Sequence, residues 1–475
     1  MVITLYSRFF EALKTRNISF CNWKGSNNLT DYFAGKGDID LFVPISYKDD
    51  FKKIAKEFGF RCLTSYQANH PYIEHFFALD EVSLEFIHLH VYFKIVTGEH
   101  ISKNYIIPLD DYLIGNVEHN SVVPTLKNKA KLNVFLIRYY LKIGSILGLF
   151  QYFRELDKYN NEWNSLDLSE ENEPIQDIGL TKEIVDDMRR AYEHSGLFSR
   201  LILSLKIKNF FKNYKRKSFF EHQLFNIKNI GVRFINKLIL KRKKFLDPGL
   251  VIAICGLDGS GKSTLVKKLK ENFSTACCVK VIHLGRPSPS SATLLISPMI
   301  NVFSQLRRLK VSPNDDKEQP RNNDISLLQA IRYVILAYDR KKASIRAHRI
   351  QEKGYIVICD RYPGIMNGKM DSPKIPHVST SGCVYKYLHK KENQLYNSIK
   401  PAEIIFHLSV PLEVSIQRNN QREKFGKETD SEIRDRYVRN KDAVFLGKNY
   451  NFVDATPPFT EVLAQVSNSI WNFKP

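Results

Sequence analysis

Apolar and polar positions divide the chain into three zones that differ in periodicity. In the first zone, residues 1–115, short apolar runs predict strands, and apolar residues at helical spacing predict helices. Strands are expected at 18–23, 39–43 and 82–91, and helices at 5–15 and 49–58. This mixture predicts an α+β domain in the N-terminal part of the chain.

The second zone, residues 116–246, repeats apolar residues at helical spacing and is expected to be mostly helical. Its segment 205–244 contains thirteen Lys or Arg residues and one acid, Glu221. A basic amphipathic segment of this kind is typical of a helix that lies on an anionic membrane surface or contacts nucleic acid. The alternative is a helical packing element with a solvated basic face.

The third zone, residues 247–475, begins where Asp247, Pro248 and Gly249 break the helical pattern. Short apolar runs alternate here with longer helical segments, which is typical of a parallel sheet covered by helices on both faces. Polar loops interrupt the alternation at 312–323 and 363–382. The predicted fold class is α/β, with strands at 251–255, 279–284, 355–359, 404–408 and 450–453.

Composition and charge narrow the class of partner. The chain has 475 residues, 43% of them hydrophobic, and a formal net charge of +21. The hydrophobic content supports folded cores rather than disorder. The charge favours polyanionic partners such as nucleotides, nucleic acid or an anionic membrane, although a solvated Lys-rich surface gives the same number.

Cysteine usage and hydropathy indicate a location. The seven cysteines form no CxxC pair, which fits a reducing cytoplasm. The N-terminus lacks the pattern of a signal peptide, and no run reaches the ~18 apolar residues of a membrane span. The expected location is the cytoplasm, with contact at the periphery of the inner membrane as an option for the basic segment.

The strongest chemical motif follows the first strand of the third zone. The pattern GxxxxGK[ST] stands between a predicted strand and a predicted helix, the context that a phosphate-binding loop requires. Backbone N–H groups and the helix N-terminus would hold the phosphates, Lys262 would bridge the β- and γ-phosphates, and Ser263 would ligate Mg²⁺. The expected nucleotide-binding residues of this loop are Gly256, Gly259, Ser260, Gly261, Lys262, Ser263 and Thr264.

Residues after the later strands extend this site. Asp360 follows a neighbouring strand, where an acid can order the Mg²⁺ shell, and Arg361 can clamp a second phosphate. Cations in the segment after the fourth strand could close over the transferring phosphoryl group. They are Arg418, Arg422 and Lys424. After the last strand, a turn at Asp454 and Ala455 could hold an adenine.

In this order, residues 250–475 resemble the thymidylate kinase-like branch of the P-loop nucleoside monophosphate kinases. The resemblance implies that Asp258 contacts a sugar hydroxyl of the phosphate acceptor and that Arg361 and Arg286 belong to the acceptor site. It also implies a lid that supplies the catalytic cation, because Gly259 stands where one subgroup has an arginine. The lid residues are Arg418, Arg422 and Lys424.

The base-recognition side departs from that family. After Asp360-Arg361-Tyr362 the family usually continues with a Ser and then an Ala-Tyr-Gln run that packs on thymine, whereas this chain continues Pro-Gly-Ile-Met-Asn-Gly. The phosphate-donor side is intact, so the predicted cofactors are ATP and Mg²⁺. The predicted acceptor is not thymidylate, but a sugar, a glycan or another phosphorylated small molecule.

A second motif lies near the N-terminus. Gly25 and Ser26 follow a predicted strand, and Asp38 and Asp40 come shortly afterwards at i and i+2, on one side of the next strand. Two such carboxylates can bind the divalent ions of nucleotidyl transfer. Residues 5–115 resemble the polymerase β-type nucleotidyltransferases, which usually add a third carboxylate. The candidates nearby are Glu85, expected on the opposite face of its strand, and His88 and His90, which could help to hold a metal or form a polar strand edge.

Three functions remain open. The first is an ATP-dependent kinase whose N-terminal domain binds the acceptor or transfers a nucleotide; fusions of these two domain types are, by resemblance, associated with bacterial surface-polysaccharide gene sets. The second is a nucleotidyltransferase that uses Asp38 and Asp40 and is regulated by the P-loop domain. The third is a non-enzymatic, nucleotide-dependent interaction protein that contacts nucleic acid through its basic helices.

Overall fold

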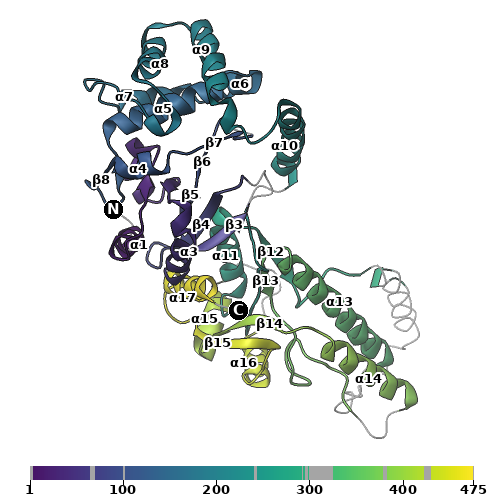
Figure 1. The fold of residues 1–475 in the computed structure, drawn as a ribbon. Helices are drawn as coiled ribbons and strands as arrows, with labels where there is room; N and C mark the ends of the chain where they lie inside the picture. Colours follow the sequence, from purple (N-terminus) through teal and green to yellow (C-terminus); the bar gives the residue numbers. More distant parts are fainter. Residues whose placement is uncertain are drawn as a thin grey trace. The chain divides into compact units, whose positions relative to one another are not determined.

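The structure is a computed structural model that describes residues 4–64, 70–99, 102–239, 243–290, 293–294, 298, 325–377, 382–421 and 429–473. The chain forms two compact units, Met1–Leu246 and Asp247–Pro475. The helices of the predicted second zone belong to the first unit. Each unit is described by itself (Figure 1).

Unit 1 contains an eight-stranded mixed sheet in the order β10-β3-β4-β5-β2-β1-β9-β8. Strands β2 and β5 are parallel, as are β1 and β9, and the other neighbours are antiparallel. Strands β6 and β7 form a separate hairpin. The strands are β1 (Cys21–Asn22), β2 (Ile39–Phe42), β3 (Arg61–Thr64), β4 (Ile73–Leu79), β5 (Phe86–Tyr92), β6 (Ile95–Thr97), β7 (Tyr105–Ile107), β8 (Val117–Glu118), β9 (Thr125–Leu126) and β10 (Lys244–Phe245).

The period of two along β5 separates a core face from a polar face. Ile87, Leu89 and Val91 are fully buried and pack with aromatic residues of the first and third helices. Their neighbours His88 and His90 point to the other face of the sheet. This alternation is what places the polar residues of unit 1 together.

The helices of unit 1 lie in two groups. Helices α1 (Thr4–Thr15) and α3 (Lys48–Glu57) pack on the core face of the sheet, with the short α2 (Leu29–Phe33) nearby in sequence. A separate helical layer surrounds α5 (Asn128–Ile143), whose buried side chains anchor a second core (Figure 1). The other helices are α4 (Asp110–Gly115), α6 (Ile146–Arg154), α7 (Leu156–Asn164), α8 (Lys182–His194), α9 (Leu197–Phe210) and α10 (Phe219–Ile239).

Short 3₁₀ turns connect several of these elements: η1 (Ser26–Asn28), η2 (Ile45–Tyr47), η3 (Gln176–Ile178) and η4 (Phe211–Tyr214). In the zone predicted as mostly helical, η4 thus separates α9 from α10. Within the described ranges, none of the helices combines the length and the hydrophobicity that crossing a membrane requires.

Unit 2 contains a five-stranded, fully parallel sheet in the order β12-β13-β11-β14-β15. This confirms the predicted α/β class for the C-terminal part of the chain. The central strand is nearly all aliphatic and buried on both faces, as expected for a parallel sheet. The strands are β11 (Leu250–Gly256), β12 (Val279–His283), β13 (Ile356–Asp360), β14 (Ala402–Ser409) and β15 (Gly447–Asp454).

Helices cover both faces of this sheet (Figure 1). Helices α13 (Leu327–Gln351) and α14 (Cys383–Asn397) pack on each other and over the face that carries Val251, Ala253 and Cys255. Helices α11 (Lys262–Ala276) and α17 (Phe459–Asn472) also pack on each other, with the Phe273 and Trp471 rings 6.2 Å apart. The shorter α15 (Leu412–Asn420) and α16 (Asp430–Asn440) come between β14 and β15. The predicted loop at 312–323 lies outside the described residues.

Candidate active site

The loop after β11, residues 256–264, passes tightly between its neighbours and ends on the first turn of α11; it is called the glycine loop below. A Cβ atom at Gly256, where φ is +141°, would lie 2.3 Å from the Leu408 carbonyl oxygen. Gly261 has φ +86° and immediately precedes α11. These two positions need the conformational freedom of glycine. Ser263 and Thr264 are exposed at the start of the helix, whereas the Ser260 side chain is buried.

Lys262 is buried beside the glycine loop, with 6% of its surface exposed. Its Nζ donates to the Leu257 carbonyl oxygen at 2.5 Å and lies 3.5 Å from Asp258 Oδ1. Burial, followed by the charge of Arg361, lowers the pKa of Lys262 to about 8. An ammonium held in this way is poorly solvated, so an anionic ligand at the loop would interact with it strongly.

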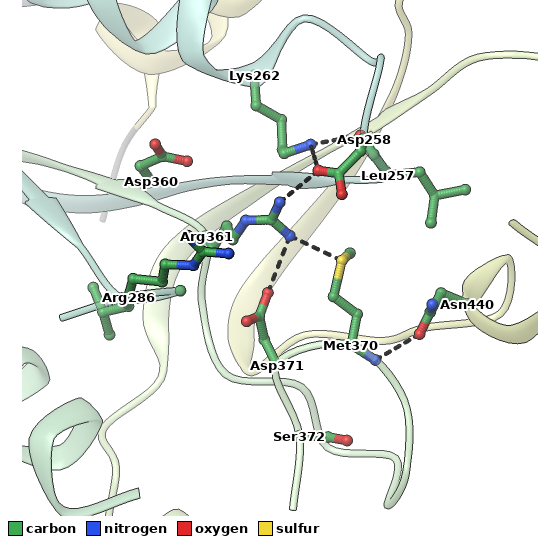
Figure 2. Close-up of polar contacts among 12 residues, drawn as sticks. Leu257, Asp258, Lys262, Arg286, Asp360, Arg361, Met370, Asp371, Ser372 and Asn440 are labelled. Carbon is green, nitrogen blue, oxygen red and sulfur yellow. Dashed lines mark hydrogen bonds and ion pairs between the residues drawn. The ribbon is translucent and has the colours of Figure 1, made fainter. Parts of the chain in front are cut away.

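Asp258 joins three cations at the mouth of the glycine loop, two of which, Lys262 and Arg361, are labelled in Figure 2. Besides Lys262, its carboxylate accepts from Arg361 Nη2 at 2.6 Å and from Arg436 Nη1 at 2.5 Å. Burial acts to raise the pKa of Asp258, but Lys262, Arg361 and Arg436 outweigh burial and lower it to about 2. The carboxylate is therefore ionised and holds basic side chains from three separate segments in one place.

Arg361 is held by contacts on both sides. Its φ of +68° is rarely adopted by a residue with a side chain. Its Nη1 lies 2.9 Å from Met370 Sδ and 3.5 Å from Asp371 Oδ2 (Figure 2). The turn that contains Gly285 also lies close to it, since a Cβ there would be 2.4 Å from Arg361 Cδ. A strained backbone kept by these contacts directs the guanidinium toward Asp258.

A cavity of about 750 Å³ opens beside Asp258 and Ser263. Its lining includes three acids, Asp258, Asp371 and Glu392, and twice as many basic residues, which leaves an excess of positive charge. The basic residues are Arg286, Arg340, Arg361, Lys374, Arg436 and Arg439. Apolar parts of Tyr333, Leu336 and Tyr396 complete the wall. The cavity can accept a small anionic molecule next to the glycine loop.

Arg340 supports this cavity from inside α13. It is 4% exposed, and its guanidinium donates to the Leu284 and Gly285 carbonyl oxygens at 3.0 and 3.1 Å. It also donates to Asp371 Oδ1 at 2.6 Å and to the Tyr396 hydroxyl at 2.5 Å. One buried side chain thereby connects the segment after β12, the loop after β13 and α14.

Asp360 and Ser263 offer oxygen ligands near the glycine loop. Asp360 is the last residue of β13 and pairs in register with Ile254 of β11, so it stands where that strand approaches the loop. Its Oδ2 lies 3.4 Å from His283 Nε2. A carboxylate and a hydroxyl are ligands that Mg²⁺ prefers, so these residues fit the ion expected with ATP.

The lid residue Arg418 and the adenine-turn residue Ala455 are in contact, since Arg418 Nη2 donates to the Ala455 carbonyl oxygen at 2.9 Å. Ser415 of the same helix α15 donates to the Asp258 carbonyl oxygen of the glycine loop at 2.7 Å. Asp454 Oδ1 accepts from the Thr456 backbone N–H at 2.9 Å and closes that turn. Arg422 and Lys424 lie outside the described residues.

Unit 1 has its own polar cluster on the outward face of β2 and β5. Asp40 pairs in register with His90 across the parallel strands, and the two side chains meet at 2.9 Å. Asp38 Oδ2 lies 3.7 Å from His90 Nδ1. The ligand atoms of Asp38, Asp40 and His90 all lie within 4.8 Å of one another, close enough to hold a metal ion. Burial lowers the pKa of His90 to about 4, so its imidazole is neutral.

The other residues predicted for this site are arranged around that cluster. Gly25, with φ +69°, precedes the η1 turn that starts at Ser26. His88 Nδ1 lies 3.9 Å from Asp38 Oδ2, while its Nε2 lies 3.0 Å from His75 Nδ1. Glu85 is exposed before β5 starts and does not belong to the group of possible ligands found among the described residues. The third member of that group is His90, beside Asp38 and Asp40.

Lysines accompany these carboxylates. Lys24 Nζ lies 3.1 Å from Asp40 Oδ1 and donates to the Tyr92 hydroxyl at 3.2 Å. Lys103 Nζ donates to the same hydroxyl at 3.0 Å. Lys243 Nζ lies within 3.2 Å of His75 Nδ1. Since amines outnumber carboxylates here, the cluster is suited to an anion as well as to a metal ion.

The buried amine of Lys142 in unit 1 should make the free energy of unfolding depend on pH. Burial, followed by the charges of Arg138 and Lys24, lowers the pKa of Lys142 from 10.5 to about 7. Between these values the unfolded chain binds the proton more strongly, so the free energy of unfolding should rise with pH by about 1 kcal/mol per pH unit. We expect Lys142→Met to flatten this rise in denaturant unfolding curves of the full chain.

The matched control is Lys158→Met, which replaces an exposed lysine on the neighbouring helix α7. That variant should keep the slope of the parent protein. Equal slopes in the Lys142→Met variant and the parent would contradict the prediction.

Several site residues carry no recognisable sequence signal. Arg436 and Arg340 come from helices that read as ordinary amphipathic segments, and His75 comes from a strand that the pattern did not predict. The sequence predicts His90 together with His88 as a possible metal ligand, because the two are two residues apart and so lie on the same face of a strand.

Part of the chain is similar to a protein named as ATP-binding. No protein-family model matches the chain. The Escherichia coli (strain K12) protein named "Uncharacterized ATP-binding protein YghS" is 29% identical over 154 residues, which is 31% of this chain and 63% of that protein. Among solved structures, the crystal structure of APE1195 aligns with 47% of this chain and 96% of its own at 12% identity and a TM-score of 0.25. The chain is thus similar, over part of its length, to a protein named as ATP-binding.

Proposed function

We propose that unit 2 is an ATP-dependent phosphotransferase of the thymidylate kinase-like type whose acceptor is not thymidylate. The observation that carries the proposal is the junction of the glycine loop and the basic cavity at Asp258 and Ser263. A loop suited to a nucleoside triphosphate thus lies next to a cavity suited to an anionic acceptor. The resemblance of part of the chain to a protein named as ATP-binding supports the donor side.

In this proposal the residues of the chain position ATP and the acceptor and neutralise the negative charge of the phosphates. The N–H groups of the glycine loop and Lys262 hold the donor phosphates, and Ser263 and Asp360 hold Mg²⁺, which supplies charge neutralisation when bound. Arg361, Arg436 and the neighbouring arginines hold the acceptor. Because Asp258 already pairs with Arg361 and Arg436, an incoming acceptor phosphate must take over these cations, which frees the carboxylate for an acceptor hydroxyl.

The acceptor class follows from the lining. Six basic against three acidic side chains favour a phosphorylated or otherwise anionic molecule. The aromatic residues Tyr333, Tyr396 and Tyr437 in the wall offer faces and hydroxyls of the kind that sugars contact. A sugar phosphate or a phosphorylated glycan therefore fits the cavity better than an uncharged alcohol.

The test is transfer of label from γ-labelled ATP in the presence of Mg²⁺. The acceptor panel contains nucleoside monophosphates, free sugars, sugar phosphates and lipid-linked glycans. We expect label on an anionic sugar-containing acceptor, and none on thymidylate. Label on thymidylate would contradict the proposed acceptor, and the absence of label on every acceptor together with intact ATP binding would contradict the kinase.

The polar cluster of unit 1 favours a second candidate, metal-dependent nucleotidyl transfer. The supporting observation is the set of Asp38, Asp40 and His90, whose ligand atoms lie within 4.8 Å of one another. Two carboxylates and a neutral imidazole fit a transition-metal ion such as Mn²⁺ better than Mg²⁺, which prefers oxygen ligands alone. Lys24 and Lys103 would then contact the phosphates of the nucleotide.

This candidate predicts that the full chain binds Mn²⁺ without nucleotide. We expect Asp40→Asn to weaken this binding by about 10-fold or more, because it removes a charged ligand at the centre of the set. The electron paramagnetic resonance signal of free Mn²⁺ measures how much of the ion remains unbound and so gives the change in affinity. Asp80→Asn, which alters a carboxylate in the β4–β5 turn, should leave binding unchanged. Equal Mn²⁺ binding by both variants would place the metal elsewhere.

A further inference from the structure

Helix α10 turns a polar side toward the rest of unit 1. Asn226 and Asn229 are only 4% and 5% exposed. The ring of His222 reaches Ser102, with Nε2 2.7 Å from Oγ. Asn226 Nδ2 also contacts Glu99 at 3.5 Å. The side of an amphipathic helix that packs on its own domain is normally apolar. In α10 the inward side is polar instead.

The opposite side of α10 carries large apolar side chains. Phe220, Leu224 and Ile227 are 78%, 69% and 68% exposed. Their spacing of i, i+4 and i+7 aligns them on one side of the helix. Lys228, the next residue, is exposed beside them. A solvent-facing row of three large apolar side chains is unusual on a soluble protein and indicates a surface that binds something.

Helix α9 repeats the same arrangement. Phe198, Ile202 and Leu205 are 75%, 45% and 60% exposed, again at i, i+4 and i+7, and Lys206 follows as Lys228 does on α10. Both helices lie at the outside of unit 1 (Figure 1). The sequence of this region is one-sided in charge, because residues 205–244 contain thirteen Lys or Arg and one acid, Glu221. We call Phe198, Ile202, Leu205, Phe220, Leu224 and Ile227 the apolar rows.

We propose that the apolar rows of α9 and α10 bind the chain to an anionic lipid surface. Aromatic and aliphatic side chains of an interfacial helix enter the boundary between headgroups and acyl chains, while lysines beside them extend to the lipid phosphates. An anionic lipid surface would therefore interact both with the apolar side chains and with the basic residues of these helices. Nucleic acid would interact with the positive charge but leave the apolar side chains in water. A protein partner would cover the apolar rows but gives no reason for the one-sided basic charge.

The test measures binding of the full chain to vesicles of phosphatidylcholine alone and of phosphatidylcholine mixed equally with phosphatidylglycerol, without nucleotide. We expect binding to the mixed vesicles only, reduced by raised salt. The triple variant Phe220→Gln, Leu224→Gln, Ile227→Gln should bind about 100-fold more weakly, because it removes three side chains that would leave water. The variant Lys206→Gln, Lys228→Gln should bind about 10-fold more weakly, mainly through lost charge.

The matched control is Val384→Gln, Tyr387→Gln, which replaces exposed apolar residues of α14 in unit 2, 57% and 63% exposed. It should bind vesicles like the parent. Three results would overturn the proposal: equal binding by the triple variant, salt-sensitive nucleic-acid binding in place of vesicle binding, or a dimer that the triple variant abolishes. Lower thermal stability of the triple variant without vesicle binding would also overturn it, since the row would then be covered within the chain. Because the assay contains no ATP, its outcome does not depend on phosphate transfer.

Discussion

Replacement of Lys262 by alanine should lower the rate of phosphate transfer by about 1000-fold or more. The ammonium of Lys262 is the buried cation at the glycine loop, and an alanine there leaves the developing charge on the transferred phosphoryl group unbalanced. Asp258 keeps Arg361 and Arg436 as partners in the variant, so the fold should survive. The measurement is the initial rate of label transfer from γ-labelled ATP, together with a thermal unfolding curve.

The control for that variant is Lys268→Ala. Lys268 lies on the same helix, is 53% exposed and pairs with Glu271 on the surface. Its loss should change the rate by less than about 2-fold, as for most surface positions. γ-Label on the acceptor that survives Lys262→Ala would contradict the role given to Lys262. Label that reaches an acceptor from α-labelled ATP and disappears in Asp40→Asn would place the chemistry in unit 1, because nucleotidyl transfer moves the α-phosphoryl group and releases the γ-phosphate in pyrophosphate.

Replacement of Arg340 by methionine should lower the stability of unit 2 by about 3–5 kcal/mol. Methionine fills much of the same space, yet it leaves the Asp371 carboxylate with the longer 3.5 Å contact to Arg361 in place of the 2.6 Å bond to Arg340. It also removes the donor from the carbonyl oxygens of Leu284 and Gly285. Unpaired buried charges and acceptors are among the costliest defects in a folded protein. Hydrogen exchange of peptides from β11 and β13, followed against denaturant concentration, reports this loss for unit 2 alone.

Arg346→Met is the matched control, since Arg346 is exposed on the same helix. It should change the stability by about 0.5 kcal/mol or less. A similar loss in both variants would mean that the helix, rather than the buried contacts of Arg340, is the cause. Intact stability in the Arg340 variant would show that the loops around the cavity do not depend on this side chain.

Local sequence patterns were sufficient for the sheet of unit 2. Strands β11 and β13 are short apolar runs bounded by polar residues or glycine, and a strand buried on both faces leaves this trace. The edge strands β12 and β15 include exposed polar residues and keep only a short apolar part. The predicted 251–255 became β11, Leu250–Gly256, and the glycine loop follows it directly. Motif and strand are contiguous in sequence, so no long-range information was needed to place them together.

The sheet of unit 1 was predicted less completely. Strands β3 and β4 lack a clean alternation, and the segment predicted to begin at 82 forms a turn through Leu84, whose φ is +57°, before β5 starts at Phe86. The Asp80 carboxylate stabilises that turn by accepting from the Ser83 backbone N–H. Turn contacts of this kind involve few residues and compete successfully with weak strand propensity.

Contacts between distant segments could not be inferred from the pattern. Arg436 reaches Asp258 across 178 positions, and the sequence near either residue contains nothing that specifies the other. The sequence of α10 likewise does not specify which face of the helix packs on unit 1. Its periodicity shows two faces, but which face packs inward depends on Ser102 and Glu99, which belong to a different part of unit 1.

The strand order of unit 2 has a consequence for synthesis on the ribosome. The central strand β11 pairs with β13 and β14, so Ile252 lies opposite Ile358 and Ile404, residues made much later. At about 5–20 residues per second, the nascent β11 would wait roughly ten to thirty seconds for both neighbours. Unit 1 is already complete in sequence during that interval. The aliphatic β11 is therefore the segment that a chaperone would most need to shield while the chain is being made.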